Sequence, residues 1–398
     1  MVDYDVIIIG AGPAGLFCAA NLNESVLVLD RMPSPGKKLL ISGSGQCNLT
    51  HEEPIANYLT HYGDHGAFVK PALMACSFAD TCRFFEAHGV PLETTDEGKV
   101  FPKSRDANDV LSALLDAVRG KVRCGAEVTA VAWNDGIFTV TTHDRSFTSR
   151  HLVIATGGKS YPHTGSNGSG YQLAASLGHT IVEPKEALTP VYVKNFPLQE
   201  LSGISFPNAK IQIWRSGKKL KETAGDLLIT RFGFSGPGIL NASRWMQKKD
   251  VLKLSFIGLT EAEFDAVLVE RTQKDGGKLV SNIFYNLGVP ERLVKTLAPP
   301  EVKCAQLSAP ERRRLVKAFC SYEAEIDHLG GFTAAMATAG GVSLDEVNRK
   351  TCESKLIPGL FFAGEVLDID GDTGGYNIQA AFSTARLIAQ KISARTTE

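Results

Sequence analysis

The segment from Val6 to Asp30 constrains the fold of this chain more than any other part of it. It reads VIIIGAGPAGLFCAANLNESVLVLD: an apolar run, glycines at Gly10, Gly12 and Gly15, a helix-forming stretch, a second apolar run and an acid. In a strand–turn–helix–strand unit, such glycines permit a tight turn, let the backbone approach a pyrophosphate and let the helix pack on the strand. The helix N-terminus then faces the phosphates. The segment predicts a dinucleotide site, and the alternative is a glycine turn without a ligand.

Asp30 supports the dinucleotide interpretation. It ends the second apolar run about 20 residues after the glycines, where a carboxylate can accept hydrogen bonds from a ribose. A glycine pattern alone is weak evidence, but here the strand before it, the helix after it and the spaced acid agree. These features could serve either NAD or FAD.

Composition limits the class of protein. The 398 residues suggest two or three domains, and the net charge of -1 gives no overall attraction to nucleic acid or to a membrane. No apolar run reaches the 18 or so residues of a membrane span, and the N-terminal apolar stretch lacks the features of a signal peptide. We therefore expect a cytoplasmic protein without a membrane partner. The eight cysteines are scattered without zinc-site spacing, which predicts reduced thiols and no metal site.

The pattern of residue types along the chain changes twice, which indicates separate parts. Residues 31–51 form a Gly/Ser-rich segment too long for an ordinary connection. Alternating strands follow over 122–156, with a hairpin turn at Asn134-Asp135-Gly136. The apolar spacing predicts helices over 66–89, 107–119 and 171–177. A β-rich part, a helical part with a capping box at Ser308–Glu311, and a second glycine-rich part come after. The predicted boundaries are 1–190, 191–258, 259–327 and 328–398.

The C-terminal glycine-rich part distinguishes between the two cofactors. Leu360–Glu365 reads as an apolar strand followed by a glycine and a carboxylate, and a glycine turn at 371–377 leads into a terminal helix. In a large class of FAD enzymes, this arrangement brings a last strand back to the middle of the cofactor and points a helix N-terminus at the flavin. The positive helix end would stabilise the charge that develops on reduction. A nicotinamide dehydrogenase does not need this element, so we predict FAD.

Four segments resemble a bacterial flavoprotein family known as BaiN/RdsA-like, which is YhiN-type and related to aminoacetone oxidases. They are IIIGAGPAGLFCA, GKKLLISGSGQCNLT, ATGGKSYPHTGSNGSGYQLAASLGH and GLFFAGEVLDIDGDTGGYNIQAAFSTA, and they span nearly the whole chain. The resemblance implies an α/β fold with a Rossmann-type, glutathione-reductase-like FAD domain that carries an inserted β-rich domain and a helical module. One departure is Gln46, which stands where the family usually has an arginine.

The resemblance also implies which residues contact FAD. The pyrophosphate contacts are Gly10, Gly12, Pro13, Ala14 and Gly15, and Asp30 lies at the adenosine ribose. The ADP half also includes Val128, Thr156 and Gly157. The residues beside the ribityl chain and flavin ring are Lys38, Ser42, Gly43, Ser44, Gly45, Gln46 and Cys47. The C-terminal contacts are Gly364, Glu365, Asp368, Gly375, Tyr376 and Asn377.

Several reactions fit such a flavoprotein. The first is hydride transfer from reduced flavin to an activated C=C bond, as in family members that form dihydrouridine or reduce steroids. This needs an acid, and the predicted catalytic residues are Cys47 and Tyr376; each has the alternative role of a packing residue. Oxidation of a small amine, a dicarboxylate reductase and a flavin-containing binding protein are further alternatives. A disulfide reductase is disfavoured because Cys47 has no second cysteine nearby.

The distribution of charge bears on the substrate. Residues 201–325 contain 20 Lys/Arg and 13 Asp/Glu, a net charge of +7, which leaves -8 for the rest of the chain. Such asymmetry is typical of a nucleic-acid-facing part, although solvated surface charge is an equal alternative. The predicted substrate is therefore RNA, as uridine in ribosomal RNA, or a small molecule. No second dinucleotide fingerprint appears, so NAD(P)H would bind transiently as the electron donor.

Overall fold

The structure is a computed structural model that describes residues 2–285, 287–299 and 301–396. The chain divides into two compact units. Unit 1 combines Met1–Ala187 with Ala335–Glu398, and unit 2 is Leu188–Ala334. The chain therefore leaves unit 1, builds a second unit and returns, which is the organisation that the change in sequence texture indicates.

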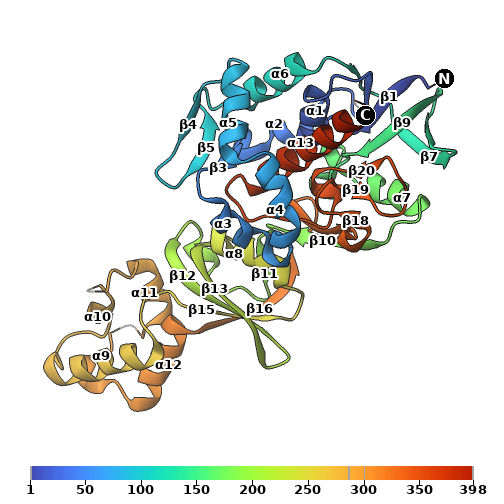
Figure 1. Cartoon of the computed structure of the whole chain (residues 1–398). Helices are drawn as coiled ribbons and strands as arrows, with labels where there is room; N and C mark the ends of the chain where they lie inside the picture. The colour runs from blue at the N-terminus through green and yellow to red at the C-terminus, as the bar shows by residue number, and fades with distance from the viewer. Residues whose placement is uncertain (1, 286, 300, 397–398) are drawn as a thin grey trace. The chain divides into compact units, whose positions relative to one another are not determined.

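Unit 1 is built on a sheet whose central strands are parallel, in the order β6-β2-β1-β9-β20. Figure 1 labels β1, β9 and β20 of this sheet. Their bounds are Lys121–Arg123 (β6), Val26–Leu29 (β2), Tyr4–Ile9 (β1), Ser146–Ile154 (β9) and Leu360–Phe362 (β20). Ile9 pairs with both Leu29 and Ile154, and Phe362 pairs with Ile154, so these strands end at one edge. Ligands of open parallel sheets bind at this carboxyl edge.

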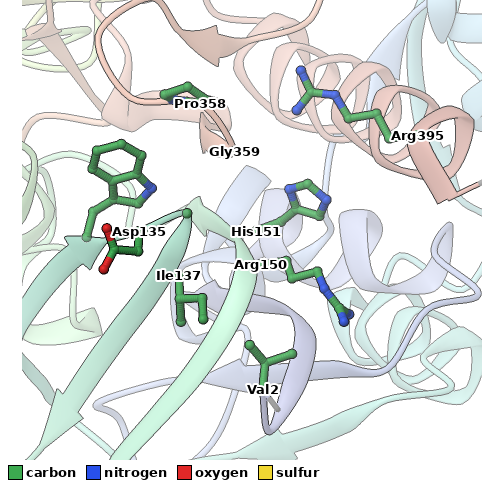
Figure 2. Close-up of a pocket in the computed structure, with 10 residues that line it drawn as sticks. Val2, Asp135, Ile137, Arg150, His151, Pro358, Gly359 and Arg395 are labelled. Atoms are coloured by element: carbon green, nitrogen blue, oxygen red, sulfur yellow. The ribbon is translucent and has the colours of Figure 1, made fainter.

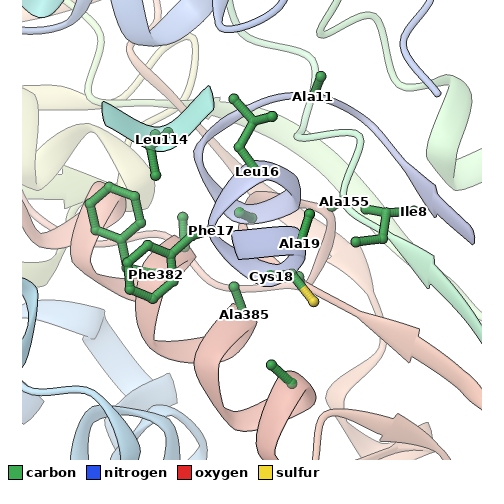
Figure 3. Close-up of a cluster of buried hydrophobic side chains, with 14 of the residues drawn as sticks. Ile8, Ala11, Leu16, Phe17, Cys18, Ala19, Leu114, Ala155, Phe382 and Ala385 are labelled. Carbon is green, nitrogen blue, oxygen red and sulfur yellow. The ribbon is translucent and has the colours of Figure 1, made fainter. Parts of the chain in front are cut away.

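Alternate residues of β1 enter two separate cores, because both faces of the parallel sheet are covered. Val6 and Ile8 pack in a cluster with residues of several helices, whereas Ile7 and Ile9 pack on the opposite face. Three of these helices are α1 (Pro13–Ala20), α6 (Ala107–Ala117) and α13 (Tyr376–Thr396). Figure 3 shows Phe17 of α1 against Phe382 of α13, with ring centroids 4.8 Å apart. The N-terminal and C-terminal helices are thus packed together beside the same strand.

Further strands extend unit 1. β7 (Val128–Asn134) and β8 (Ile137–Thr142) form a hairpin that continues antiparallel to β9, and the positive φ angles of Asp135 and Gly136 confirm the predicted turn. The edge strands are β18 (Val347–Asn348) and β19 (Glu353–Ser354). A small separate sheet contains β3 (Thr50–His51), β5 (Lys99–Pro102) and β4 (Leu92–Thr94).

The predicted helix over 66–89 is wrong as a single element. It consists of α4 (Gly66–Ala75) and α5 (Phe78–Ala87), because Cys76 is extended and Ser77 starts a new helix. The Ser77 hydroxyl and the Asp80 carboxylate form a capping box, which satisfies free backbone N–H groups at the new N-terminus. The remaining helices of unit 1 are α2 (Lys37–Leu40), α3 (Ile55–Tyr58) and α7 (Ser169–Ser176).

Two strands carry the chain out of unit 1 and back into it. β10 (Ile181–Ala187) and β17 (Ala337–Val342) pair antiparallel, with Ala187 opposite Ala337. The ends of the inserted unit are therefore neighbours in a two-stranded ribbon.

Unit 2 is a closed antiparallel barrel with helices inserted between two of its strands. The strands, in barrel order, are β11 (Val191–Val193), β14 (Gly233–Ser235), β13 (Lys218–Ile229), β12 (Ser205–Arg215), β15 (Val251–Leu254) and β16 (Tyr322–Leu329). The helices are α8 (Pro237–Ala242) and, between β15 and β16, α9 (Glu261–Lys274), α10 (Ser281–Tyr285), α11 (Glu291–Leu297) and α12 (Ala309–Cys320). One apolar cluster joins barrel and helices. The predicted capping box at Ser308 and Glu311 is confirmed. None of the helices in the described part of the chain is long and apolar enough to cross a membrane.

Candidate functional site

The three glycines after β1 have different surroundings. A Cβ on Gly10 would lie 2.4 Å from the Ala155 carbonyl oxygen, and one on Gly15 would lie 1.9 Å from the Gly10 carbonyl oxygen. A Cβ on Gly12 would have nothing within 4 Å. Gly10 and Gly15 are therefore required by the packing of the chain itself, whereas Gly12 borders open space at the N-terminus of α1. Pro13 occupies the first turn of that helix.

Asp30 lies at the carboxyl end of β2, beside the glycine turn. One carboxylate oxygen accepts a hydrogen bond from the Ala11 amide at 2.7 Å, and the other accepts one from the Met32 amide at 2.8 Å. Burial raises the pKa of Asp30, although these two hydrogen bonds act in the opposite direction. The backbone therefore holds the carboxylate at the edge where a ribose of a dinucleotide would bind.

The other predicted ADP contacts lie on neighbouring elements of the same unit. Val128 is buried at the start of β7 and pairs with Thr142 of β8. Thr156 follows β9 and packs closely on α7, because a Cβ on Gly170 would lie 1.9 Å from its hydroxyl oxygen. Gly157 has a φ of +72°. Their contacts with an adenosine group stay predictions.

Lys38 and Glu365 contact each other. The Lys38 ammonium donates hydrogen bonds to the Glu365 carboxylate at 2.6 Å and to the Ser160 hydroxyl at 2.5 Å. Glu365 also accepts hydrogen bonds from the Ser160 hydroxyl and from the Thr338 amide, at 2.9 and 2.8 Å. The side chains of the pair are 24% and 18% exposed. This network joins helix α2, the loop after β9, strand β17 and the turn after β20.

The loop from Ser42 to Asn48 has an unusual backbone. Gly43, Ser44, Gly45 and Cys47 all have positive φ, between +55° and +88°, which is uncommon for the two residues that carry a Cβ. The cysteine amide donates to the Ser42 carbonyl at 3.0 Å. At the other end of the loop, the Asn48 side-chain oxygen is buried and has no hydrogen-bond partner among the described residues.

Gln46 meets an arginine from outside the loop. The Arg105 guanidinium donates to the Gln46 side-chain oxygen at 3.2 Å and to Glu93 at 2.6 Å, and lies 4.1 Å from the centre of the Phe101 ring. The structure therefore places a guanidinium beside this loop, in which the resemblance noted above would lead one to expect an arginine at position 46.

Cys47 is fully buried in the apolar cluster of unit 1, together with Leu39 and Leu49. Burial raises the pKa of its thiol to about 12, and hydrogen bonding with Ser42 opposes this only in part. The surroundings are those of a packing residue that keeps its proton. A catalytic role for this thiol stays a prediction.

The C-terminal loop is held by its own side chains and by the backbone of β3. The Asn377 side chain accepts a hydrogen bond from the Gly371 amide and donates one to the Gly371 carbonyl, at 2.8 and 2.9 Å. A Cβ on Gly375 would lie 2.6 Å from the Thr50 carbonyl group. Asp368 accepts a hydrogen bond from the Gly340 amide at 2.9 Å. The predicted contacts therefore form one rigid turn before α13.

Gly364 brings this C-terminal region to the glycine turn. Its amide donates to the Thr384 hydroxyl at 3.0 Å, and its φ is +70°. A Cβ on Gly364 would lie 3.1 Å from the Cβ of Ala14 in the first turn of α1. The two ends of the chain thus meet at the carboxyl edge of the sheet.

Tyr376, the first residue of α13, is sandwiched between two histidine rings. The His61 ring lies parallel to it with centroids 4.0 Å apart, and the His51 ring lies on it at 5.2 Å. One His61 nitrogen is 3.0 Å from the Asp372 carboxylate and the other is 3.4 Å from Glu53. Burial, together with the Glu53 carboxylate, raises the pKa of the Tyr376 hydroxyl.

This histidine pair, Glu53, Asp372 and Arg105 are functional candidates that the sequence did not indicate. A signal for part of the set was present, because three of the nine histidines lie between His51 and His65. The third, His65, is 3.9 Å from the Asp368 carboxylate. Among the described residues, no group of three or more His, Cys, Asp or Glu side chains is arranged to hold a metal ion.

The site fits FAD on three observations of the chain itself. Gly12 leaves open space at the N-terminus of α1, where the amides can bind a pyrophosphate. The buried Asn48 oxygen is an acceptor that lacks a donor within the described structure. The first turn of α13 contains no acid, so its amide dipoles remain suited to negative charge.

A cavity of about 490 Å³ lies at another place on unit 1, beside the middle of β9 and the residues that precede β20 (Figure 2). Its arginines are already paired, since Arg150 contacts Asp5 and Arg395 makes two hydrogen bonds to Glu353. Burial lowers the pKa of His151, which also lines it. None of the predicted FAD contacts lines this cavity, so it is distinct from the site at the carboxyl edge.

Comparison with known proteins gives matches along nearly the whole chain. A family model described as the HI0933-like protein Rossmann domain matches residues 4–391. A ribosomal RNA dihydrouridine synthase of Escherichia coli is 31% identical, with 99% of each chain covered. A 3-dehydro-bile acid delta(4,6)-reductase of Clostridium scindens is 29% identical, with 98% of each covered. The structure of a flavocytochrome c3 fumarate reductase in an open conformation has a TM-score of 0.52 at 16% identity, over 99% of this chain and 79% of that one. These matches confirm the predicted family and fold class.

Proposed function

Because the chain belongs to the HI0933-like family of Rossmann-fold, FAD-dependent oxidoreductases, we propose that it reduces the C5=C6 bond of uridine in ribosomal RNA. Bound FAD, once reduced by two electrons from NAD(P)H, would supply the hydride for one carbon of that bond, and a side chain of this chain would supply the proton for the other. The product would be dihydrouridine.

The observation that carries this proposal is the full-length similarity to two relatives with different substrates in their names. Dihydrouridine is uridine with two hydrogens added across a C=C bond, and a delta(4,6)-reductase also adds hydrogens to C=C bonds. Reduction of an activated C=C bond is therefore common to both names. The RNA substrate is favoured over the steroid by the positive charge of residues 201–325.

The residues of the chain would bind and orient the cofactor. The α1 amides after Gly12 would hold the pyrophosphate, and Asp30 would accept hydrogen bonds from the ribose. The Lys38–Glu365 pair would fix the loops on either side of the ribityl chain. FAD itself supplies the hydride chemistry once bound. The protein then determines which substrate reaches the flavin and where the proton comes from.

We assign the proton to the Tyr376 hydroxyl, with the Cys47 thiol as the alternative. Burial raises the pKa of both groups, so both are protonated at neutral pH. Of the two, Tyr376 is next to groups that could return a proton to it, because its hydroxyl interacts with the Glu53 carboxylate, and the His61 ring contacts both Glu53 and Asp372. A general acid must regain its proton in each turnover, which favours the tyrosine.

NAD(P)H is the proposed electron donor. The sequence contains a single glycine fingerprint of the dinucleotide type, which the FAD would occupy. NAD(P)H would therefore bind transiently over the flavin and leave before the RNA substrate binds.

The decisive experiment maps dihydrouridine in ribosomal RNA from a strain that lacks this protein, with complementation by the wild type and by Gly12→Val. We expect the loss of at least one dihydrouridine and its return with the wild type only. Unchanged dihydrouridine in the deletion strain would refute the RNA substrate.

Purified protein distinguishes the alternative reactions. NADPH should bleach the flavin without oxygen, and unmodified ribosomal RNA should restore its colour faster than air does. Bleaching by aminoacetone with rapid release of peroxide would support an amine oxidase instead. If a steroid enone restores the colour and RNA does not, the substrate is a steroid, as in the name of the bile acid reductase, and not RNA.

A further inference from the structure

Three aromatic rings lie in a row on the outside of the barrel in unit 2. The Tyr192 ring is stacked on the His328 ring, with centroids 4.4 Å apart and planes 13° apart. The Phe232 ring is also parallel to Tyr192, at 6.1 Å and 21°. We call Tyr192, Phe232 and His328 the ring row. It joins β11, β16 and the turn that connects β13 to β14.

Two rings of the ring row, Phe232 and His328, are exposed and the third, Tyr192, is half-buried, whereas several nearby residues of the same strands are buried. Phe232 is 57% exposed and the His328 side chain is 56% exposed. Val191, Phe234 and Ile326, next to or near the row in the same strands, are buried in the barrel core. The alternation of strands therefore places the core residues inside and the rings outside. The barrel does not need these rings for its packing.

The backbone holds the row in position. The Val193 amide donates to the Phe232 carbonyl at 2.9 Å, and the Thr230 amide donates to the Gly233 carbonyl at 2.9 Å. A Cβ on Gly233 would lie 2.2 Å from the Val191 carbonyl oxygen, so the turn must approach β11 closely. A fixed, exposed aromatic surface costs little further conformational entropy when it binds a planar ligand.

The charge around the row is suited to an anionic polymer. The Arg231 guanidinium lies 5.7 Å from the centre of the Phe232 ring. Lys194 and Lys249 are joined to β16 by backbone hydrogen bonds from their amides to Glu325 and Ile326. Residues 188–334 together carry 21 Lys/Arg and 15 Asp/Glu, a net charge of +6. Asp327 is the acid next to the row, and it is paired with His328 and Lys248.

We propose that the ring row stacks unpaired bases of an RNA and that Arg231 binds a neighbouring phosphate. This inference rests on the proposed function, and it names the surface that holds the substrate. The Tyr192 and His328 rings already stack on each other, so bases would stack on the ring faces that the row leaves open, and the nearly parallel planes, 13° and 21° apart, let a strand of stacked bases continue the row. Bases inside a duplex cannot stack on side chains, so the row selects single-stranded or looped RNA.

The test measures binding of a fluorescein-labelled oligouridine of about 12 nucleotides to the FAD-loaded full-length protein by fluorescence anisotropy. Because one stacked base contributes about 1–3 kcal/mol, Phe232→Ala and Tyr192→Ala should each weaken binding roughly five- to hundredfold. Phe232→Tyr keeps the ring and should bind within about twofold of the wild type. A duplex RNA of equal length should compete poorly.

Tyr285→Ala is the matched control, because Tyr285 is an exposed aromatic residue of the same unit, 42% exposed, and lies outside the row. It should bind oligouridine as the wild type does. Arg231→Gln should reduce the slope of log affinity against log salt by about 0.7, the value for one phosphate of a single strand. Circular dichroism melting checks that each variant is folded.

The outcomes separate the ring row from the proposed function. If Phe232→Ala and Tyr192→Ala bind oligouridine like the wild type while RNA is still reduced, the ring row is not an RNA-binding surface, and the proposed function stands. If the row variants lose oligouridine but no RNA yields dihydrouridine with the wild type, the function is wrong and the row stands. Equal loss of affinity in Tyr285→Ala, or equally tight binding of duplex RNA, would also overturn the row.

Discussion

Gly12 and Gly15 should respond in opposite ways to the same added methyl group. Gly12 has φ of -85°, an angle open to any residue, and a Cβ there would have nothing within 4 Å. In the protein without FAD, Gly12→Ala should therefore be neutral or raise the free energy of unfolding by about 0.4–1 kcal/mol, because alanine restricts the unfolded chain. Gly15→Ala would place a Cβ 1.9 Å from the Gly10 carbonyl oxygen and should cost about 3 kcal/mol.

In the presence of FAD, Gly12→Ala should be less stable than the wild type, although without FAD it is at least as stable. If the open space at Gly12 is where the pyrophosphate binds, the new methyl group excludes it. At a concentration of one hundred times the dissociation constant, FAD adds about 2.7 kcal/mol to the stability of the wild type, and Gly12→Ala should lose most of this.

Hydrogen exchange of peptides covering 4–29 is a suitable assay, because it reports the stability of unit 1 alone. It would be measured on the protein stripped of FAD and again after FAD is added, alongside flavin fluorescence titrations. Protection of Gly12→Ala by FAD equal to that of the wild type would refute a pyrophosphate site at Gly12. Destabilisation of its FAD-free form as large as that of Gly15→Ala would refute the assignment of open space there.

Three further outcomes follow from buried polar groups. Lys38→Met leaves the Glu365 carboxylate without its cation and should lower the free energy of unfolding by about 1–3 kcal/mol, whereas adding Glu365→Gln should restore part of the loss in a double-mutant cycle. Arg215→Met should destabilise unit 2 by about 3–5 kcal/mol without weakening FAD binding, because the Asp250 side chain is 1% exposed and binds Arg215 at 2.9 Å; a change in FAD affinity would contradict this. The Cys47 thiol, with a pKa raised to about 12, should have a thiolate fraction of about 10⁻⁴ at pH 8 and resist iodoacetamide until urea unfolds the chain. The raised pKa lies above that of the unfolded chain, so the contribution of Cys47 to the free energy of unfolding is full below about pH 8.5 and declines at higher pH. Urea titrations of the wild type and of Cys47→Ala at several pH values would measure this decline.

The parts of the site that the sequence predicted are those encoded by short spacings. Gly10, Gly12 and Gly15 lie within six residues, and Asp30 ends the next strand, so their positions at one edge follow from a single βαβ unit. The capping box at Ser308 is likewise local. Glycine and capping patterns specify backbone geometry over a few residues, which a sequence displays directly.

The parts that the sequence did not reveal depend on contacts between distant residues. His61 meets Asp372 across 311 positions, and Lys38 meets Glu365 across 327. Each residue alone could have been a solvated surface group. Arg105 is a further case, because nothing near it in the chain connects it with Gln46. The break between α4 and α5 is an exception, because its cause is local. Ser77 and Asp80 cap the second helix, and a prediction from apolar spacing alone does not take capping residues into account.

Because β10 pairs with β17, unit 2 is connected to unit 1 through two neighbouring strands and could be removed or replaced as a whole. Since Ala187 lies opposite Ala337, a short turn could join the two strands in place of the whole insertion, and the register of the ribbon would be kept. By the same geometry, a different insertion could be grafted onto these two strands without altering the carboxyl edge of the sheet. On the proposed function, a change in what this ribbon carries would change the substrate while the flavin domain is kept.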